Sequence, residues 1–256
     1  MKVTIIGSGN VAEAFATALH ANSVEVVQVV ARNRERGEAL ARIAESRYCA
    51  IDAPLDRADL YLIAVSDRAV AEVAASLQLP EGGIVAHTAG CGLLEWLPKS
   101  HRRAIIYPFQ TFSSGRKVDF RRVPIFVEAE EEGVRDEARR FASLLSDCVG
   151  DADTEVRRHI HLAGVFASNF ANHMYACATA VLDRVGLPFS TIAPLIEETA
   201  SKAVASGDPK GVQTGPAVRG DVATRERHTS LLGDDPMTEI YNKISDNIWQ
   251  TKISKR

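Results

Sequence analysis

The stretch TIIGSGNVAEAFATALH, residues 4–20, decides the fold expected for this chain. A short apolar run ends at Gly7, and an alanine-rich helical pattern follows at once. In a G-x-G-x-x-G/A turn the first glycine permits a sharp bend, the second lets the backbone approach a pyrophosphate, and the third small residue lets the helix pack on the strand. Gly7, Gly9 and Ala12 occupy these positions. The stretch therefore predicts a dinucleotide-binding strand–turn–helix unit, and a glycine-rich bend without a ligand is the alternative. The predicted cofactor contacts in this turn are Gly7, Ser8, Gly9, Asn10, Val11 and Ala12.

Outward from this turn, apolar runs alternate with amphipathic segments over about the first 150 residues. That alternation is typical of a parallel sheet covered by helices. We expect strands at 3–6, 25–30, 60–65, 84–87, 104–107 and 124–128, and a short last strand near 147–150. After about residue 153 only helical patterns remain, at 154–185, 189–206, 222–232 and 237–254.

The first of these later helices is apolar almost all round, so we expect it to run through the middle of its domain. The predicted fold class is α/β, with a doubly wound Rossmann-type sheet in residues 1–151. A smaller all-helical domain is expected in residues 152–256, in which substrate binding and dimerisation would take place.

Composition narrows the class of protein. The 30 basic and 33 acidic residues leave a net charge of −3, and no basic arm or stripe indicates a nucleic-acid partner. The four cysteines lie far apart with no C-x-x-C pair, which favours free thiols over metal ligands and fits a cytoplasmic protein. The chain begins directly with a strand, and polar residues interrupt its longest apolar helix. We therefore expect neither a signal peptide nor a membrane span.

The end of the second strand indicates which dinucleotide is bound. An NAD site would place a carboxylate there to bind the ribose 2′-hydroxyl, but the sequence reads ARNRERG from Ala31. Guanidinium groups suit a 2′-phosphate. We therefore predict NADP, with Arg32 and Asn33 at the phosphate and Arg34 stacked on adenine. The alternative is that the two arginines only solvate the start of a helix.

Ligands of such sheets lie beyond the carboxyl ends of the strands. The strand ends at 64–66 and 88–89 are therefore expected to flank the ribose and the nicotinamide. The predicted contacts there are Ala64, Val65, Ser66, Thr88 and Ala89. His87 is either an acid–base group or a structural residue, and Gln110 is a candidate cleft contact.

Several segments together carry a family resemblance. IIGSGNVA, ARNRERG, AVSDRAV and HTAG, followed by a helical domain, resemble pyrroline-5-carboxylate reductases and the deazaflavin-dependent NADP oxidoreductases. YPFQTFS, HLAGVFASNFANHMYACA and TGPAVRGDVATRERHTSLL look like an uncharacterised Rossmann-like oxidoreductase family whose helical C-terminal domain has no assigned function. The resemblance covers nearly the whole chain. It implies an NADP-binding protein and an interlocked homodimer, but no particular substrate.

The wider superfamily that this resemblance implies includes 6-phosphogluconate and 3-hydroxyisobutyrate dehydrogenases, and the expected helical domain resembles the C-terminal domain of 6-phosphogluconate dehydrogenase. One position departs from the pattern of this superfamily. Its hydroxyacid dehydrogenases carry a catalytic lysine one turn before an asparagine on the helix that opens the second domain. Asn169 matches that asparagine, but Val165 stands in place of the lysine. Lysine-based alcohol oxidation is therefore not expected, whereas the reduction of an imine remains open.

Two groups of polar residues form the predicted catalytic site. His161, Ser168 and Asn172 share one face of the long helix, with Asn169 beside them; they either face the nicotinamide or bond neighbouring helices. In the segment TGPAVRGDVATRERH, Arg219 suits a substrate carboxylate. Asp221 could instead only cap the next helix, and Arg219 could only pair with an acidic neighbour. The predicted catalytic set is Arg219, Asp221, Thr224, His228, His161 and Asn169.

These patterns predict an NADP(H)-dependent oxidoreductase. It would transfer a hydride to or from a small anionic or imine-like substrate held in the cleft between the domains. The alternative is an NADP-binding sensor or scaffold without catalytic activity, which the missing lysine favours.

Overall fold

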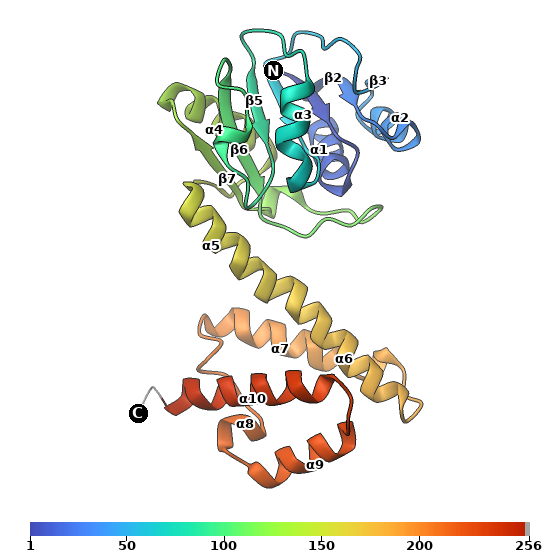
Figure 1. Ribbon diagram of the computed structural model, residues 1–256, viewed down its shortest axis with the longest axis vertical. Helices are drawn as coiled ribbons and strands as arrows, with labels where there is room; N and C mark the ends of the chain where they lie inside the picture. Colours follow the sequence, from blue (N-terminus) through green and yellow to red (C-terminus); the bar gives the residue numbers. More distant parts are fainter. Residues whose placement is uncertain (254–256) are drawn as a thin grey trace. The chain divides into compact units, whose positions relative to one another are not determined.

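The computed structural model describes residues 1–253 and forms two compact units, Met1–Phe170 and Ala171–Arg256. Each unit is considered by itself. The first unit contains a sheet flanked by helices, coloured blue to green in Figure 1, and the second is helical.

The sheet of the first unit has eight strands in the order β3-β2-β1-β4-β5-β6-β7-β8. All neighbouring pairs are parallel except β6 and β7, so the last two strands run against the others. The carboxyl ends of β1, β2, β4, β5 and β6 therefore meet at one edge, which is where a doubly wound sheet binds its ligand. The strands are β1 (Lys2–Ile6), β2 (Glu25–Val30), β3 (Arg47–Cys49), β4 (Leu60–Ile63), β5 (Ile84–His87), β6 (Arg102–Pro108), β7 (Ile125–Ala129) and β8 (Val149–Asp151).

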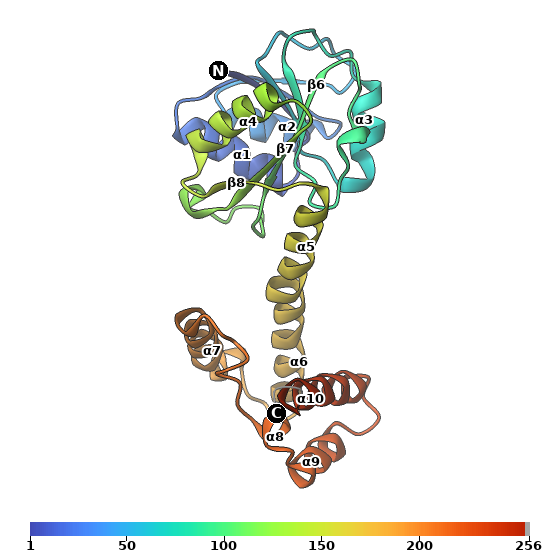
Figure 2. The same ribbon diagram turned by 90° about the vertical axis from the view of Figure 1, so that its left-hand side faces the viewer.

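Helices cover both faces of this sheet. On one face, α1 (Asn10–Ala21), α2 (Arg34–Ile43) and α4 (Glu132–Leu145) bury residues such as Phe15, Leu40 and Phe141 against the strands. On the other face lie α3 (Val70–Ser76) and the 3₁₀ turn η2 (Leu94–Trp96). Figure 2 shows α3 on the side of the sheet opposite α1, α2 and α4. Short 3₁₀ turns η1 (Asp67–Ala69) and η3 (Phe120–Arg122) lie in the connections.

The long helix of the sequence pattern consists of three segments. These are α5 (Thr154–Gly164), a π-helical segment η4 (Val165–Phe170), and α6 (Ala171–Asp183). The expectation that this helix is buried in the middle of its domain is wrong for the single chain. Arg157 is the one buried residue of α5, and neither η4 nor α6 has a buried residue. Within each unit, the described residues leave the apolar side chains of η4 and α6 at least partly exposed.

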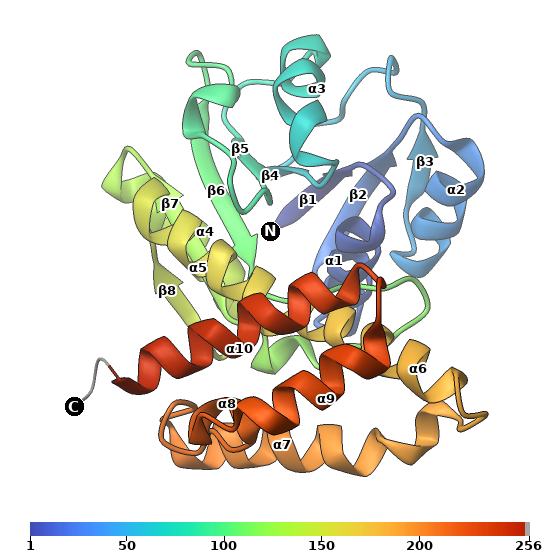
Figure 3. The ribbon, with the colours of Figure 1, turned by 60° about the horizontal axis from the view of Figure 1, so that its bottom comes forward.

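The second unit continues with η5 (Phe189–Thr191), α7 (Ala193–Ser206), α8 (Pro216–Arg219), α9 (Val222–Leu232) and α10 (Met237–Ile253). Figure 3 shows α8 and α9 alongside α10, and the three helices contact one another. The sequence pattern predicted all these helices except α8, which is only four residues long. The last residue of the predicted segment 237–254 lies outside the described residues.

The observed architecture confirms the predicted fold class, a Rossmann-type sheet followed by a helical region. Within the sheet, the sequence patterns did not predict the three-residue strand β3, which is too short to leave an alternating pattern. The sheet ends at Asp151, where the domain boundary was predicted, whereas the first compact unit also includes α5 and η4. The boundary at 151/152 remains a prediction. Among residues 1–253, we found no helix with the length and apolar character needed to cross a membrane.

Candidate cofactor site and active site

The glycine turn after β1 has two different constraints. Gly7 has φ +121°, and a Cβ atom there would lie 2.3 Å from the carbonyl oxygen of Ala64 at the end of β4. Its N–H donates to the carbonyl of Val30, 2.8 Å away, which ties the turn to β2 as well. Gly9 is the N-cap of α1, and a Cβ at Gly9 would meet nothing within 4 Å. Gly7 is therefore required by the fold, whereas Gly9 leaves open space in front of a helix N-terminus.

That open space is part of a pocket of about 620 Å³ at the carboxyl ends of β1, β2 and β4. Ten of the predicted cofactor contacts line it. They are Gly7, Ser8, Gly9, Asn10, Val11, Arg32, Asn33, Ala64, Val65 and Ser66. Its wall also contains Ala31, Ile51, Asp67, Val73 and Phe112, which the sequence patterns did not indicate. Unpaired N–H groups at a helix N-terminus and nearby guanidinium groups suit a pyrophosphate and a further phosphate. The pocket therefore fits a phosphorylated dinucleotide.

The other predicted cofactor contacts lie outside this lining. Ala12 is fully buried on the side of α1 that faces the sheet, where its small side chain allows the helix to pack on the strands. Arg34 is exposed and pairs with Glu38 one turn along α2, at 2.7 Å. Thr88 and Ala89 are buried beyond the end of β5.

Arg36 reaches the glycine turn although no sequence pattern indicated it. Its guanidinium donates to the Oδ1 atom of Asn10 at 3.3 Å. Asn33 caps α2 by accepting a hydrogen bond from the Arg36 N–H at 2.9 Å. Arg36 therefore places a further cationic group beside the pocket. The stacking of Arg34 on adenine stays a prediction.

The segment after β6 closes one side of the pocket. The Asn10 side chain donates to the Phe112 carbonyl at 3.0 Å. The Glu13 carboxylate accepts hydrogen bonds from the Ser114 hydroxyl and the Gly115 N–H at 2.9 and 3.0 Å. Phe112, and not the predicted Gln110, belongs to the pocket wall.

His87 holds the loop that follows β5. Its Nδ1 accepts from the Ala89 N–H at 3.1 Å, so the ring proton is on Nε2, which donates to the Leu93 carbonyl at 3.2 Å. The side chain is fully buried, and burial lowers the pKa of His87 to about 4. A neutral imidazole with both nitrogens occupied is a structural group, which favours the structural interpretation of His87 over the acid–base one.

Tyr107 and His161 form a polar pair at the same edge of the sheet. The Tyr107 hydroxyl lies 3.1 Å from the Nδ1 atom of His161, which comes from α5. Burial raises the pKa of Tyr107 to about 12, so the phenol stays protonated and can donate a hydrogen bond to Nδ1. Gly90 permits this approach, because a Cβ atom there would lie 2.5 Å from the same Nδ1.

The pair brings a predicted residue, His161, next to one that the sequence patterns did not single out. The Nε2 atom of His161 makes no hydrogen bond among the described residues. Such a nitrogen is able to donate or accept a proton during a reaction. The position of Tyr107 at the end of a strand, in the segment YPFQTFS, was the signal that could have identified it.

The second unit separates the other predicted catalytic residues. Asp221 caps α9, since its carboxylate accepts hydrogen bonds from the Thr224 N–H and hydroxyl at 3.0 and 2.8 Å. These bonds hold the pKa of Asp221 below its usual value. Arg219 is exposed at the end of α8, and the Nδ1 atom of His228 lies 2.8 Å from the Tyr241 hydroxyl. Asn169 is exposed in η4 of the first unit.

A mostly apolar cavity of about 390 Å³ lies among α6, α8, α9 and α10. His228 and Tyr241 belong to its wall, whereas Arg219, Asp221 and Thr224 do not. The second unit therefore does not gather the predicted four-residue set in one pocket. Within residues 1–253, histidine, cysteine, aspartate and glutamate side chains form no group of three or more that could hold a metal ion.

A glycine turn at the ligand edge of a doubly wound sheet, together with this pocket, defines a Rossmann-type dinucleotide-binding protein. Two family models match the chain. Residues 2–90 match "NADP oxidoreductase coenzyme F420-dependent", and residues 123–248 match "Domain of unknown function (DUF2520)". A search of curated proteins found no match.

Solved structures extend the likeness over the whole chain. The "putative NADP oxidoreductase BF3122" from Bacteroides fragilis is 38% identical, with 97% of this chain and 98% of that one covered and a TM-score of 0.90. An imine reductase from Pseudomonas sp. is 18% identical, with coverage of 97% and 91% and a TM-score of 0.64. A pyrroline-5-carboxylate reductase from Coxiella burnetii is 17% identical, with coverage of 98% and 97% and a TM-score of 0.57. The last two show the shared fold alone.

The chain belongs to the family of NADP oxidoreductases in which an F420-dependent-type NADP oxidoreductase domain is joined to a DUF2520 domain. This confirms the resemblance carried by the sequence motifs.

The two glycines of the turn should respond differently to alanine. Gly7→Ala should destabilise the protein by several kcal/mol, because the new methyl group meets the Ala64 carbonyl in a backbone conformation that disfavours any side chain. Gly9→Ala should cost about 1 kcal/mol or less, as a change from glycine to alanine at an N-cap. It should nevertheless weaken NADPH binding at least about tenfold, since its methyl group fills the open space. Urea unfolding and calorimetric titration measure the two effects. Equal loss of stability in both variants would contradict this assignment.

Stability should fall in mild acid because of His87. Its folded pKa of about 4 lies below the unfolded value near 6.5, so the unfolded state binds the proton more readily. The stabilisation by the neutral ring is complete above pH 6.5 and is lost as the pH falls toward 4. Between pH 7 and 4.5 the native protein should lose about 2 kcal/mol more than His87→Gln, which does not titrate. Urea unfolding at both pH values measures this difference. If the native protein and His87→Gln lost the same free energy of unfolding between pH 7 and 4.5, this role of His87 would be disproved.

Proposed function

We propose that this protein is an NADP(H)-dependent oxidoreductase that reduces a small imine-like or anionic substrate. The observation that carries the proposal is the pocket that joins the glycine turn, the ends of β2 and β4, and Arg32. Two proteins with the same fold, an imine reductase and a pyrroline-5-carboxylate reductase, are named for reductions of this kind. The absence of a lysine at Val165 argues against lysine-based alcohol oxidation.

The end of β2 supports NADP over NAD. Neither Ala31 nor Arg32 is a carboxylate that would bind a ribose 2′-hydroxyl, and Arg32 and Asn33 line the pocket. Arg36 adds a further guanidinium beside Asn10. A planar, permanently charged guanidinium favours a phosphate over a hydroxyl group. The Bacteroides relative is likewise named for NADP.

Removal of the Arg32 guanidinium should distinguish the two cofactors. In Arg32→Ala the dissociation constant of NADPH should rise about 10- to 100-fold, the loss expected for one or more charge-assisted hydrogen bonds. The dissociation constant of NADH should change less than about threefold, since NADH has no 2′-phosphate. Arg34→Ala is the matched control, because Arg34 is paired with Glu38 outside the pocket lining. Fluorescence titration measures all four constants. Equal affinity of the native protein for NADH and NADPH would refute NADP specificity.

When bound, NADPH supplies the hydride of the reaction. The turn residues 7–12 would hold its pyrophosphate at the N-terminus of α1. We propose that Val65 and Ser66 contact the ribose, and that Thr88 and Ala89 flank the nicotinamide from the end of β5. These residues follow strands whose carboxyl ends meet at one edge of the sheet.

The proton that accompanies reduction needs a donor, and we propose His161. It belongs to the same compact unit as the cofactor pocket, and Tyr107 holds its Nδ1 so that Nε2 is left for proton transfer. The adjacent π-helical segment with Asn169 supports a functional role for this part of the chain, since such segments are frequent at functional sites. Arg219 is an exposed cation of the second unit and is our candidate for binding a substrate carboxylate, with His228 as a second acid–base group. Asp221 and Thr224 support that segment by capping α9.

A substrate screen tests the proposed reaction. The purified protein with NADPH is mixed with cyclic imines such as 2-methyl-1-pyrroline, with 2-oxo acids, and with a deazaflavin, and the loss of NADPH absorbance is followed. For a substrate that reacts, His161→Gln should lower kcat about 10²- to 10⁴-fold with unchanged NADPH affinity. Arg219→Ala should raise KM for an anionic substrate. Tight NADPH binding without turnover of any compound would instead favour the non-catalytic sensor.

We also propose that two copies associate through the helical domain. None of the residues of α6 or α7 is buried, and large apolar side chains are exposed there, with Leu195 at 66% and Val204 at 83%. Exposed apolar surface of this extent marks an interaction site in many proteins. The four unpaired cysteines support a reducing compartment such as the cytoplasm.

A further inference from the structure

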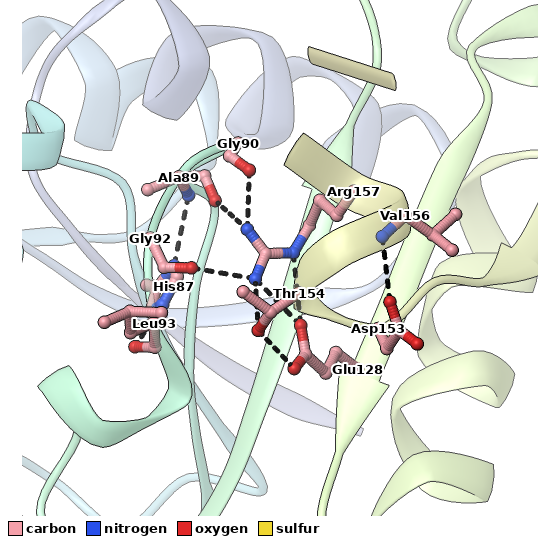
Figure 4. A network of polar contacts seen from close by, with 10 residues as sticks. All are labelled: His87, Ala89, Gly90, Gly92, Leu93, Glu128, Asp153, Thr154, Val156 and Arg157. Atoms are coloured by element: carbon pink, nitrogen blue, oxygen red, sulfur yellow. Dashed lines mark hydrogen bonds and ion pairs between the residues drawn. The ribbon is translucent and has the colours of Figure 1, made fainter. Parts of the chain in front are cut away.

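Arg157 on α5 is the largest fully buried side chain of the described residues, with 0% exposure. Figure 4 shows its guanidinium at the centre of a polar network. It pairs with the Glu128 carboxylate of β7 at 2.8 Å. It also donates to the carbonyl oxygens of Ala89, Gly90 and Gly92 at 3.2, 2.5 and 2.8 Å.

These contacts connect three parts of the first unit. Thr154 completes the network by donating to Glu128 at 2.7 Å and accepting from Arg157 at 3.3 Å. The three carbonyl groups all belong to the loop after β5, the loop that we assign to the nicotinamide. From its other side, His87 binds the Ala89 N–H and the Leu93 carbonyl of the same loop. The loop backbone is therefore fixed by two buried side chains.

Stability alone is a poor reason to bury this cation. The free energy lost when an ion pair is removed from water is about as large as the free energy gained from its electrostatic attraction. Apolar side chains of similar size therefore often stabilise a fold equally well. A planar guanidinium, however, directs five N–H groups along set directions. Its distinctive contribution is therefore geometric, since it sets the positions of the three carbonyl groups relative to α5.

His161 lies four residues after Arg157 and therefore on the same face of α5. Its ring contacts the same loop, since the space above Gly90 is filled by His161. Its Nδ1 meets the Tyr107 hydroxyl at 3.1 Å. A shift of α5 along the loop would change this contact directly.

We propose that Arg157 is a positioning residue for the reductase reaction. By binding the Ala89–Gly92 loop and Glu128, it sets the register of α5 on the sheet and so places His161 against Tyr107 and the nicotinamide loop. The inference rests on the proposed role of His161 in proton transfer.

The test compares two variants with a matched control. Arg157→Met removes the guanidinium group. Arg157→Lys keeps the charge, but a single ammonium group cannot bind three carbonyl groups and a carboxylate together. Arg103→Met is the control, because Arg103 is also buried, at 8% exposure, and also pairs with a carboxylate, that of Glu130. Arg103 bonds the Leu94 carbonyl but no carbonyl of residues 89–92.

The first measurement needs no substrate. In protein with ¹⁵N-labelled histidine, the Nδ1 resonance of His161 is assigned by its loss in His161→Gln, and Tyr107→Phe gives its value without the hydrogen bond. Both Arg157 variants should move this resonance toward the Tyr107→Phe value, while Arg103→Met should leave it unchanged. If Arg157→Met does not fold, Arg157→Lys and Glu128→Gln take its place.

The second measurement uses any substrate that the screen identifies. Arg157→Lys should lower kcat about 10- to 100-fold, the effect of displacing a reacting group by about 1 Å. KM for NADPH should stay within about threefold, because the turn and Arg32 bind most of that molecule. A native His161 resonance in both Arg157 variants would overturn the proposal, whether or not a substrate is found. A displaced resonance with unchanged kcat would overturn the role of Arg157 in the reaction.

Discussion

At Gly7 the backbone of β1 turns so close to the carbonyl of Ala64 that no side chain fits between them. The same residue bonds the end of β2 through its N–H group. This one approach brings the ends of three strands together and starts α1 with its free N–H groups facing an open space. The pocket depends on it, because a side chain at this position would force β1 and β4 apart.

The other half of the ligand edge is organised by buried polar side chains. The loop after β5 has few backbone partners of its own, and His87 and Arg157 supply them. Hydrogen bonds from buried side chains hold the backbone of this loop in one conformation, and such preorganisation favours binding and catalysis. Tyr107 then joins this loop to α5 through His161. The helix therefore belongs to the first compact unit, although its sequence pattern is that of the helical region.

The sequence predicted the elements that have a strong local signal. Strand β2 and helix α9 have the expected bounds, because a turn, a cap or a clear period marks their ends. Strand β3 and helix α8 are short and have no such pattern. The glycine turn and the arginines at the end of β2 could also be predicted, because the short spacing of these residues in the sequence is enough to indicate phosphate binding. Arg36 and Phe112 were not, because each reaches the pocket through contacts between segments far apart in the chain.

The sequence by itself therefore determined the class of fold, the nucleotide-binding turn and the cationic character of the second strand's end, because each depends on residue types at short, fixed spacings. Only the tertiary structure decided which polar residues act together. It pairs Arg34 with Glu38 and brings Arg36 to Asn10 of the glycine turn. It also joins His161 to Tyr107, a residue 54 positions earlier in the chain. Hydrogen bonds over such separations depend on the packing of helices against the sheet, and no local pattern in the sequence records them.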